Sequence, residues 1–483
     1  MRSSQLLPLL ALGLLLPGSS PVVNPKRPAA APLDFGAAFR DTTMRVDYYH
    51  TGDRGRESFA LDRIVSDGRW AGSRTRLLDS LDLGTWRYLV EDSASGTLLY
   101  SRGYSSLYAE WETTGPTEAK TFHESVRFPW PRAPVRLRLE RRDRENRWRP
   151  AWASYINPGS PLANPAEPPP AQVWTLFENG PPATKVDLVL VSEGYTRAEL
   201  PRFRADVRRL VDTLFKVEPF RSRRRDFNVR AVEVPSPVSG VNRPQSGEFR
   251  RTPLSATYGI FGLERYLLTE DNRALRDALS GVPYEFLEIV VNSAAYGGGG
   301  IYNFQAATAA RAPASAYVFI HEFGHHFAGL GDEYYTSPVA YQTGAPVKVE
   351  PWEPNLTALH DPAALKWGDL VEPGTPIPTP WPKAEYEELS RAIQEARRLL
   401  LERNAPPAAF DSLFQVQRAR ERAYLAGGPY AGKVGAFEGA GYEATGLYRP
   451  ELDCIMFSRN PVGFCRVCGR AIEQVIALYG AGP

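Results

Sequence analysis

Short runs of alternating, β-branched or aromatic residues fill the chain from about residue 34 to residue 156. Runs such as 44–49, 86–90, 97–100 and 135–139 are separated by Gly, Asp, Ser and Pro, which is typical of strands joined by turns. The pattern predicts an N-terminal antiparallel β-sandwich domain, 34–156. The stretch 157–170 is rich in proline and alanine and predicts a linker.

Beyond the linker the pattern changes to strands that alternate with helices. The apolar run 186–191 predicts a buried strand, and 228–234 and 286–291 predict two more. Thr196 and Glu199 form a capping box ahead of a helix with one apolar face. Residues 171–483 are therefore predicted to form a second domain, and the fold class is multidomain α+β or α/β.

A long insertion, about 346–450, interrupts this second domain. It contains a proline-rich strap at 373–382 and two predicted helices, roughly 385–403 and 407–425. The helical pair either forms a wall of a cleft or only packs against the domain, and packing is the simpler interpretation. Another helix, 466–478, is predicted near the end of the sequence.

The first residues are predicted to be a cleaved signal peptide, 1–20, followed by a disordered leader, 21–33. Arg2 precedes an apolar run, 6–16, that is too short to span a bilayer and is followed by small residues. No later apolar run reaches the roughly 18 residues of a membrane helix, so no transmembrane segment is expected after cleavage. The protein is predicted to be exported, either periplasmic or secreted.

Length, composition and charge narrow the remaining possibilities. A chain of 483 residues with 43% hydrophobic residues can bury more than one core. Its formal net charge of +2 gives no reason to expect a nucleic-acid partner. The oligomeric state stays open.

The strongest chemical signal is H-E-x-x-H at residues 321–325. Ser315 is placed to cap a helix there, and on that helix His321 and His325 lie on one face and converge. This geometry predicts a Zn²⁺ ion, with Glu322 as the general base for its water. His326 points away from that face and is predicted to be structural.

The third zinc ligand is expected after the helix. If the helix continued, Asp332 would lie about 16 Å from His321 along the axis, too far to bind the same ion. Gly329 and Gly331 allow the chain to reverse. Asp332 is the preferred third ligand and Glu333 the alternative, with the neighbour holding a hydrogen bond behind the metal.

The motif H-E-F-G-H-x-F-x-G-L-x-D-E-Y spans residues 321–334, and Y-R-P, C-x-M and F-C-x-x-C follow downstream. With these pieces the chain resembles the immunoglobulin A (IgA) peptidase-like family of bacterial zinc metallopeptidases. The resemblance implies a secreted zinc endopeptidase with a metzincin-like catalytic domain. It does not imply an immunoglobulin substrate.

Further residues are predicted to belong to the same site. The glycine run 297–300 leads into Ile301 and Tyr302, and Gly300, Ile301 and Tyr302 are predicted to bind an extended substrate by strand addition. A flexible loop without a role is the competing interpretation. Met456 is predicted to form a methionine turn beneath the zinc, or else to pack in the core. Tyr448 and Arg449 are polar groups that either face the cleft, where they would stabilise an oxyanion, or have structural roles.

All three cysteines fall near the end of the sequence, at Cys454, Cys465 and Cys468. In an exported protein this pattern predicts one disulfide, from Cys454 to Cys465 or Cys468, and one leftover thiol. A structural zinc site is the rival interpretation. It needs four ligands, and no histidine lies close in sequence to complete it, so the disulfide is preferred.

Together these features predict a zinc metallopeptidase that hydrolyses protein or peptide substrates. Two alternatives remain. One is a secreted binding protein on a peptidase-derived fold, which the intact H-E-x-x-H argues against. The other is a zinc hydrolase of non-peptide amides.

Overall fold

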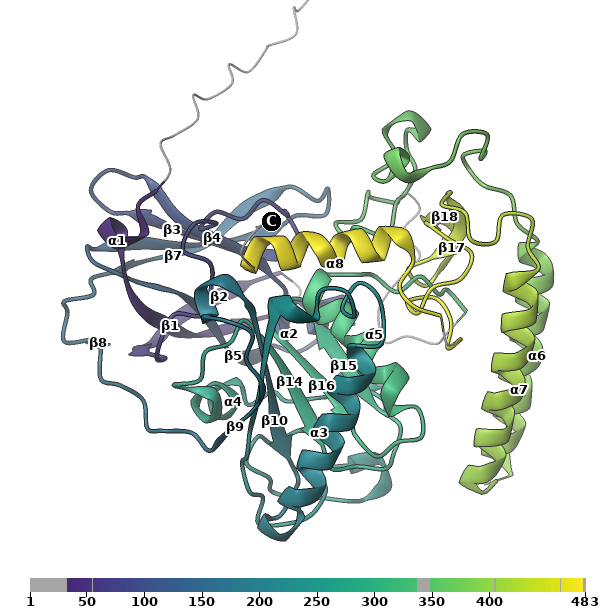
Figure 1. The fold of residues 1–483 in the computed structure, drawn as a ribbon, viewed down its shortest axis with the longest axis horizontal. Helices are drawn as coiled ribbons and strands as arrows, with labels where there is room; N and C mark the ends of the chain where they lie inside the picture. Colours follow the sequence, from purple (N-terminus) through teal and green to yellow (C-terminus); the bar gives the residue numbers. More distant parts are fainter. Residues whose placement is uncertain (1–32, 54, 337–347, 404, 461, 481–483) are drawn as a thin grey trace, which may run out of the picture.

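The computed structural model describes residues 33–53, 55–336, 348–403, 405–460 and 462–480. The predicted signal peptide, and all but the last residue of the predicted leader, lie outside the described residues. The chain has mixed α and β content with several sheets (Figure 1). Among the described residues, no helix combines the length and the apolar character needed to cross a membrane.

The N-terminal part is built from two four-stranded sheets. The first has the order β5-β1-β2-β8, with bounds Lys120–Pro131, Phe39–Gly52, Glu57–Ser66 and Ala163–Asn164. The second has the order β4-β3-β6-β7, with bounds Leu98–Tyr104, Trp86–Asp92, Val135–Arg142 and Trp148–Ile156. Alternate residues of both sheets are buried in one cluster, among them Val46, Tyr48, Tyr88 and Val90. This is the burial pattern of two sheets packed face to face.

The segment predicted as a linker does more than connect. Its strand β8 pairs in parallel with Ile64 and Val65 of β2, whereas the other strands of these two sheets pair antiparallel. The chain therefore folds back along the first sheet before it enters the second part. The domain boundaries themselves stay a prediction.

A six-stranded sheet with the order β15-β16-β14-β10-β11-β9 forms the centre of the second part. Its strands are Gly298–Ile301, Gln305–Ala309, Phe286–Val291, Val186–Glu193, Phe227–Val232 and Val173–Phe177. The four inner strands are parallel, and the edge strands β15 and β9 are antiparallel to their neighbours. Every residue of β10, β11 and β14 is buried, as expected for strands covered on both faces.

Three long helices supply the core on one face of this sheet: α3 (Leu200–Leu214), α5 (Ser315–Ala328) and α8 (Arg466–Tyr479). The opposite face is covered by α4 (Asn272–Leu279) and α2 (Leu107–Thr113), together with Phe122 of β5. Since α2 and β5 belong to the N-terminal part, the two parts share a hydrophobic core.

Polar contacts also fix the N-terminal part beside the second part. The backbone N–H of Ser105 donates to the Tyr302 carbonyl at 2.9 Å, and Asn303 Nδ2 donates to the Gly103 carbonyl at 2.9 Å. Arg127 bridges Asp67 and the carbonyl of Tyr284. These contacts place the N-terminal part next to the end of β15.

The predicted insertion contains a helical hairpin, α6 (Lys383–Glu402) and α7 (Pro407–Ala426), which stands at one side of the molecule (Figure 1). A β-hairpin of β17 (Phe437–Ala440) and β18 (Glu443–Arg449) follows it. The remaining α-helix and strands of the described residues are short: α1 (Phe35–Ala38), β12 (Thr257–Tyr258) and β13 (Leu267–Leu268).

Strand β15 lies so close to α5 that Gly300 has no room for a side chain. A Cβ added there would lie 2.1 Å from the backbone oxygen of Glu322. Gly300→Ala is therefore expected to destabilise the protein by about 1–3 kcal/mol through overpacking. The urea midpoint of unfolding measures the effect. Gly55→Ala, at an exposed position with nothing within 4 Å, is the control, and equal midpoints would contradict the close approach.

Candidate active site

Helix α5 carries the H-E-x-x-H motif and ends where the sequence predicts. Its last residue is Ala328, and Gly329 follows with a left-handed φ of 60°. Gly331 serves a different purpose from the one predicted, because its φ is not positive and a Cβ there would lie 2.5 Å from Leu356 Cδ1. Ser315 is not the helix cap, as Ala314 holds that position and Ser315 Oγ instead accepts from Arg209.

The turn at Gly329 brings Asp332 back to the two histidines. His321 Nε2 lies 3.0 Å from Asp332 Oδ1 and 3.2 Å from His325 Nε2, and His325 Nε2 lies 3.3 Å from Asp332 Oδ1. Ligand atoms about 2.0–2.1 Å from a tetrahedral zinc are about 3.3 Å apart. The three side chains therefore fit a zinc ion.

Backbone carbonyls hold both imidazoles in the tautomer that such a site needs. His321 Nδ1 lies 3.0 Å from the Ile455 oxygen, and His325 Nδ1 lies 2.5 Å from the Leu330 oxygen. A ring nitrogen that faces a carbonyl carries a proton, so each Nδ1 is a donor and each Nε2 is the nitrogen that faces the other two side chains. This is the support that metal-binding histidines commonly have.

The charges of this cluster are strongly coupled. Burial raises the pKa of Asp332, but the two imidazoles outweigh burial and hold the pKa of that carboxyl well below its usual range. Burial lowers the pKa of His325, and the Asp332 carboxylate reverses this and raises the pKa to about 9. Asp332 is therefore an ionised, acceptor-only group, as a metal ligand must be.

The residues around Asp332 form a segment, Gly331–Tyr334, that three other parts of the chain hold in place. Asn355 bonds both backbone groups of Gly331, accepting at 2.8 Å and donating at 2.9 Å. The Glu333 N–H donates to the Met456 oxygen at 2.9 Å. The turn between β17 and β18 donates the N–H of Gly441 to Asp332 and that of Tyr442 to Tyr334.

Tyr442 also reaches the site with its side chain. Its hydroxyl donates to Asp332 Oδ2, the oxygen on the far side from the imidazoles. The residue has a φ of 64°, unusual for a bulky side chain, and the two backbone bonds of its turn hold it there. Neither Tyr442 nor Asn355 was identified from the sequence. Gly439 and Gly441, both with positive φ, are a sequence signal for a turn, but residue spacing does not connect that turn to Asp332.

Glu322 lies beside the ligands, half-buried in the wall of the cleft. Burial raises the pKa of its carboxyl, while the neighbouring imidazoles oppose the shift. A carboxylate with a raised pKa next to a metal site is suited to accept and return a proton.

The cleft has a volume of about 230 Å³ and lies over this cluster. Aromatic side chains and arginines surround the motif residues: Tyr296, Tyr302, Tyr317, Tyr334, Tyr442, Trp352, Arg265, Arg397 and Arg459. Ile393, Gln394 and Arg397 of α6 and Gln417 and Glu421 of α7 also line it. The helical hairpin thus forms a wall of the cleft, contrary to the simpler interpretation of the sequence. Ser105 and Glu110 bring the N-terminal part to its rim.

The three residues predicted to bind substrate differ in placement. Gly300 and Tyr302 line the cleft, but the Ile301 side chain is buried in the core and the Ile301 carbonyl accepts a bond from His326. Strand β15, which contains Gly300, is an edge strand of the central sheet. Arg449 does not face the cleft, because it is fully buried and donates to the Gly439 carbonyl.

Met456 is buried beneath α5, where its Sδ would lie 3.0 Å from a Cβ added at Gly324. Its neighbour Ile455 supplies the carbonyl for His321, and its own carbonyl binds the Glu333 N–H. The segment therefore packs against α5 and contacts His321, and the methionine turn itself stays a prediction.

The predicted disulfide is absent from the structure. Cys454, Cys465 and Cys468 are all described, and all three are free thiols. Glu333, the alternative third ligand, lies among them rather than beside His321, with Oε1 3.2 Å from Cys468 Sγ. Successive residues of an extended segment point to opposite sides, so Asp332 and Glu333 reach different clusters.

His326 is held by two buried hydrogen bonds. Its Nδ1–H donates to the Ile301 oxygen at 2.9 Å, and the Leu287 N–H donates to its Nε2 at 3.2 Å. Burial lowers the pKa of His326 to about 4, so the ring is neutral. The residue connects α5 to the central sheet and does not face the cleft.

Comparison with known proteins gives two matches. The sequence profile of a family described as IgA Peptidase M64 matches residues 174–476, and that of a family described as Peptidase M64 N-terminus matches residues 34–153. No curated protein matches the chain.

Tyr442→Phe tests whether Tyr442 supports the proposed ligand Asp332. Loss of the hydroxyl is expected to weaken zinc binding at the three-ligand site about 10- to 100-fold, because the carboxylate loses the bond that orients it. Competition with a chromophoric chelator measures the affinity. Tyr155→Phe changes a tyrosine that is 64% exposed and serves as the control. Equal affinities in the two variants would refute the role.

His326→Phe tests the structural role of the third motif-region histidine. It leaves the Leu287 N–H without its partner, whereas the Ile301 carbonyl loses one bond and keeps the one from the Phe304 N–H. A buried unsatisfied group costs about 1–3 kcal/mol, so a loss of about that size in the free energy of unfolding is expected from urea titration at fixed zinc. His360→Phe, at an exposed loop position, should change it by less than about 0.5 kcal/mol. A His326→Phe variant as stable as the parent would show that these bonds do not hold α5.

Proposed function

The chain belongs to the IgA peptidase M64 family, and from that premise we propose that it is a zinc-dependent endopeptidase with a metzincin-like arrangement of helix, returning ligand and methionine turn. His321, His325 and Asp332 hold the zinc, and Glu322 is the general base. The substrates are proteins or peptides. The predicted signal peptide supports export, to the periplasm or the cell exterior.

One observation carries this proposal. The free ligand atoms of His321, His325 and Asp332 lie within 3.3 Å of one another in the lining of a cleft. Backbone carbonyls fix the orientation of both imidazoles. Three protein ligands with space above them are typical of catalytic rather than structural zinc.

When bound, zinc supplies a Lewis acid that polarises the scissile carbonyl and lowers the pKa of water toward about 7. Glu322 accepts the proton that the attacking water loses and delivers it to the leaving amine nitrogen. The raised pKa of Glu322 suits both transfers, since the group must bind the proton and then release it. The Tyr442 hydroxyl holds Asp332 in a fixed position beside the two imidazoles during these steps.

The cleft also supports a mode of substrate binding. Strand β15 is an edge strand of the central sheet, and Gly298 and Gly300 line the cleft. The Arg265 carbonyl accepts from the Gly298 N–H, and the Ser105 N–H donates to the Tyr302 carbonyl, so a substrate strand pairs with the edge between these two contacts. An extended peptide can approach such an edge closely enough for backbone pairing. We place the substrate strand along β15, with Tyr302 at one end. The proposal is limited to protein or peptide chains.

Three variants test the mechanism through zinc content and cleavage of denatured casein, with and without chelator. Glu322→Gln should retain zinc and lose activity by about 10²–10⁴-fold, because only the proton transfer is removed. His325→Ala should lose both the zinc of this site and the activity. His360→Ala removes an exposed histidine and should retain both.

Activity of the Glu322→Gln variant equal to that of the parent would show that another group is the base. A parent protein that binds zinc here without chelator-sensitive cleavage of any protein would favour the binding-protein alternative instead.

A further inference from the structure

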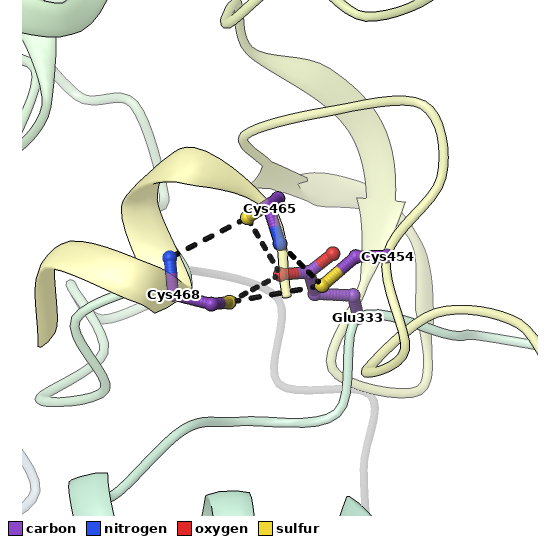
Figure 2. Close-up of side chains that lie close together, drawn as sticks. All are labelled: Glu333, Cys454, Cys465 and Cys468. Carbon is purple, nitrogen blue, oxygen red and sulfur yellow. Dashed lines mark hydrogen bonds between the residues drawn. The ribbon is translucent and has the colours of Figure 1, made fainter. Parts of the chain in front are cut away.

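A second cluster of metal-ligand side chains lies outside the cleft. Figure 2 shows Glu333, Cys454, Cys465 and Cys468 with their side chains pointing toward one another. Cys465 and Cys468 come from the start of α8, Cys454 from the segment after β18, and Glu333 from the segment after α5. One ligand atom from each lies within 4.8 Å of all the others, and all four residues are buried.

The spacing of the sulfurs fits a shared ion better than a disulfide. Cys454 Sγ and Cys468 Sγ are 3.9 Å apart, whereas a disulfide needs about 2.0 Å. Thiolates about 2.3 Å from a tetrahedral zinc are about 3.8 Å apart. Glu333 Oε1 lies 3.2 Å from Cys468 Sγ and 3.9 Å from Cys465 Sγ, so it occupies the fourth corner.

Backbone N–H groups point at the sulfurs, as they do around metal-bound thiolates. Met456 N lies 3.5 Å and Cys465 N 3.3 Å from Cys454 Sγ, and Cys468 N lies 3.4 Å from Cys465 Sγ. Such donors stabilise negative sulfur. They would contribute less to neutral thiols.

The surroundings of Glu333 indicate independently that a cation belongs in this cluster. Its side chain is fully buried, and its Oε2 has no hydrogen-bond partner among the described residues. Asn355 donates to Oε1 alone. A buried carboxylate without a cation or a full set of donors is costly, and a metal ion would compensate that cost.

Another acidic and histidine cluster in the chain shows the contrast. Asp47, Asp62 and His123 also lie close enough to share an ion, but Arg45 and Arg63 pair with Asp47, and Arg273 pairs with Asp62. Those arginines already supply the positive charge. No ion pair of Glu333 occurs within the described part of the chain.

We propose that Glu333, Cys454, Cys465 and Cys468 form a structural zinc site. Soft thiolates in tetrahedral arrangement select zinc over magnesium or calcium, and four protein ligands leave no open position for catalysis. Binding releases the thiol protons and keeps the sulfurs reduced in an oxidising compartment.

This site would hold in place the segments that form the peptidase site. Glu333 directly follows Asp332, and Cys454 precedes Ile455 and Met456, which contact His321 and the Glu333 backbone. An ion here joins the segment that carries the third catalytic ligand to the methionine turn and to α8. Glu333 lies more than a hundred residues before Cys454 along the chain, and the two segments come together only in the fold.

Zinc content and X-ray absorption at the zinc edge of the full chain test the proposal. The wild type should contain about two zinc ions per chain, with a zinc–sulfur distance of about 2.3 Å in the averaged spectrum. The His321→Ala/His325→Ala variant, which lacks the peptidase ligands, should keep about one zinc with a sulfur-dominated shell. Glu333→Gln in that background, which replaces the carboxylate by a neutral amide of similar shape, should bind the remaining zinc about tenfold or more weakly.

A spectrum of the wild type without zinc–sulfur scattering would overturn the proposal, and it needs no variant to fold. Thiol titration of the denatured protein provides the second reading. Three reactive thiols after metal removal agree with the zinc site, and one thiol with a 2 Da mass deficit would establish the disulfide instead.

The measurements distinguish failure of the peptidase zinc site from failure of the four-ligand zinc site. Zinc bound only by nitrogen and oxygen would leave the peptidase site in place and remove this one. Sulfur-bound zinc alone, unchanged by the histidine substitutions, would do the reverse.

Discussion

The whole site depends on holding one carboxylate beside two imidazoles where little water reaches. Asp332 can stay there because its charge is compensated: the imidazoles face one oxygen and the Tyr442 hydroxyl donates to the other. Burial alone would push the carboxyl toward its neutral form, and the surrounding partners reverse that tendency. Helix α5 must therefore end at Gly329, and the following segment must return to the helix and stay fixed.

That requirement explains why distant parts of the chain converge on residues 331–334. Asn355 fixes Gly331, the β17–β18 turn fixes Asp332 and Tyr334, and the segment at Met456 fixes Glu333. Each contact pairs a backbone group of residues 331–334, which would otherwise lie unpaired in the interior after the end of the helix. The long insertion thus contributes to the site in two ways, with a helical wall for the cleft and with Asn355 and the β-hairpin behind the ligands.

Patterns of local origin were predicted well. Strands such as β14 and helices such as α5 and α8 appear almost at their expected residues, because their periodicity reflects burial on one or both faces. The two histidines on one face of α5 and the break at Gly329 follow from helix geometry and glycine conformation. Local features were harder to interpret where they had non-local partners. Ser315 bonds Arg209 rather than capping its helix. Strand β8 of the predicted linker pairs with β2, and Arg449 has the buried, structural placement rather than one in the cleft.

The sequence alone determined that His321, Glu322 and His325 share one helix, that the chain turns after this helix, and that Asp332 and Glu333 follow the turn. These are matters of spacing and backbone freedom within fourteen residues. Only the tertiary structure decided which carboxylate meets the histidines, that Tyr442 and Asn355 support it, and that Glu333 completes a group of three cysteines. The pairings of Asn355, Tyr442 and Cys468 join residues 22 to 135 positions apart. They are set by how the sheet, the insertion and the last helix pack, which residue spacing along the chain does not encode.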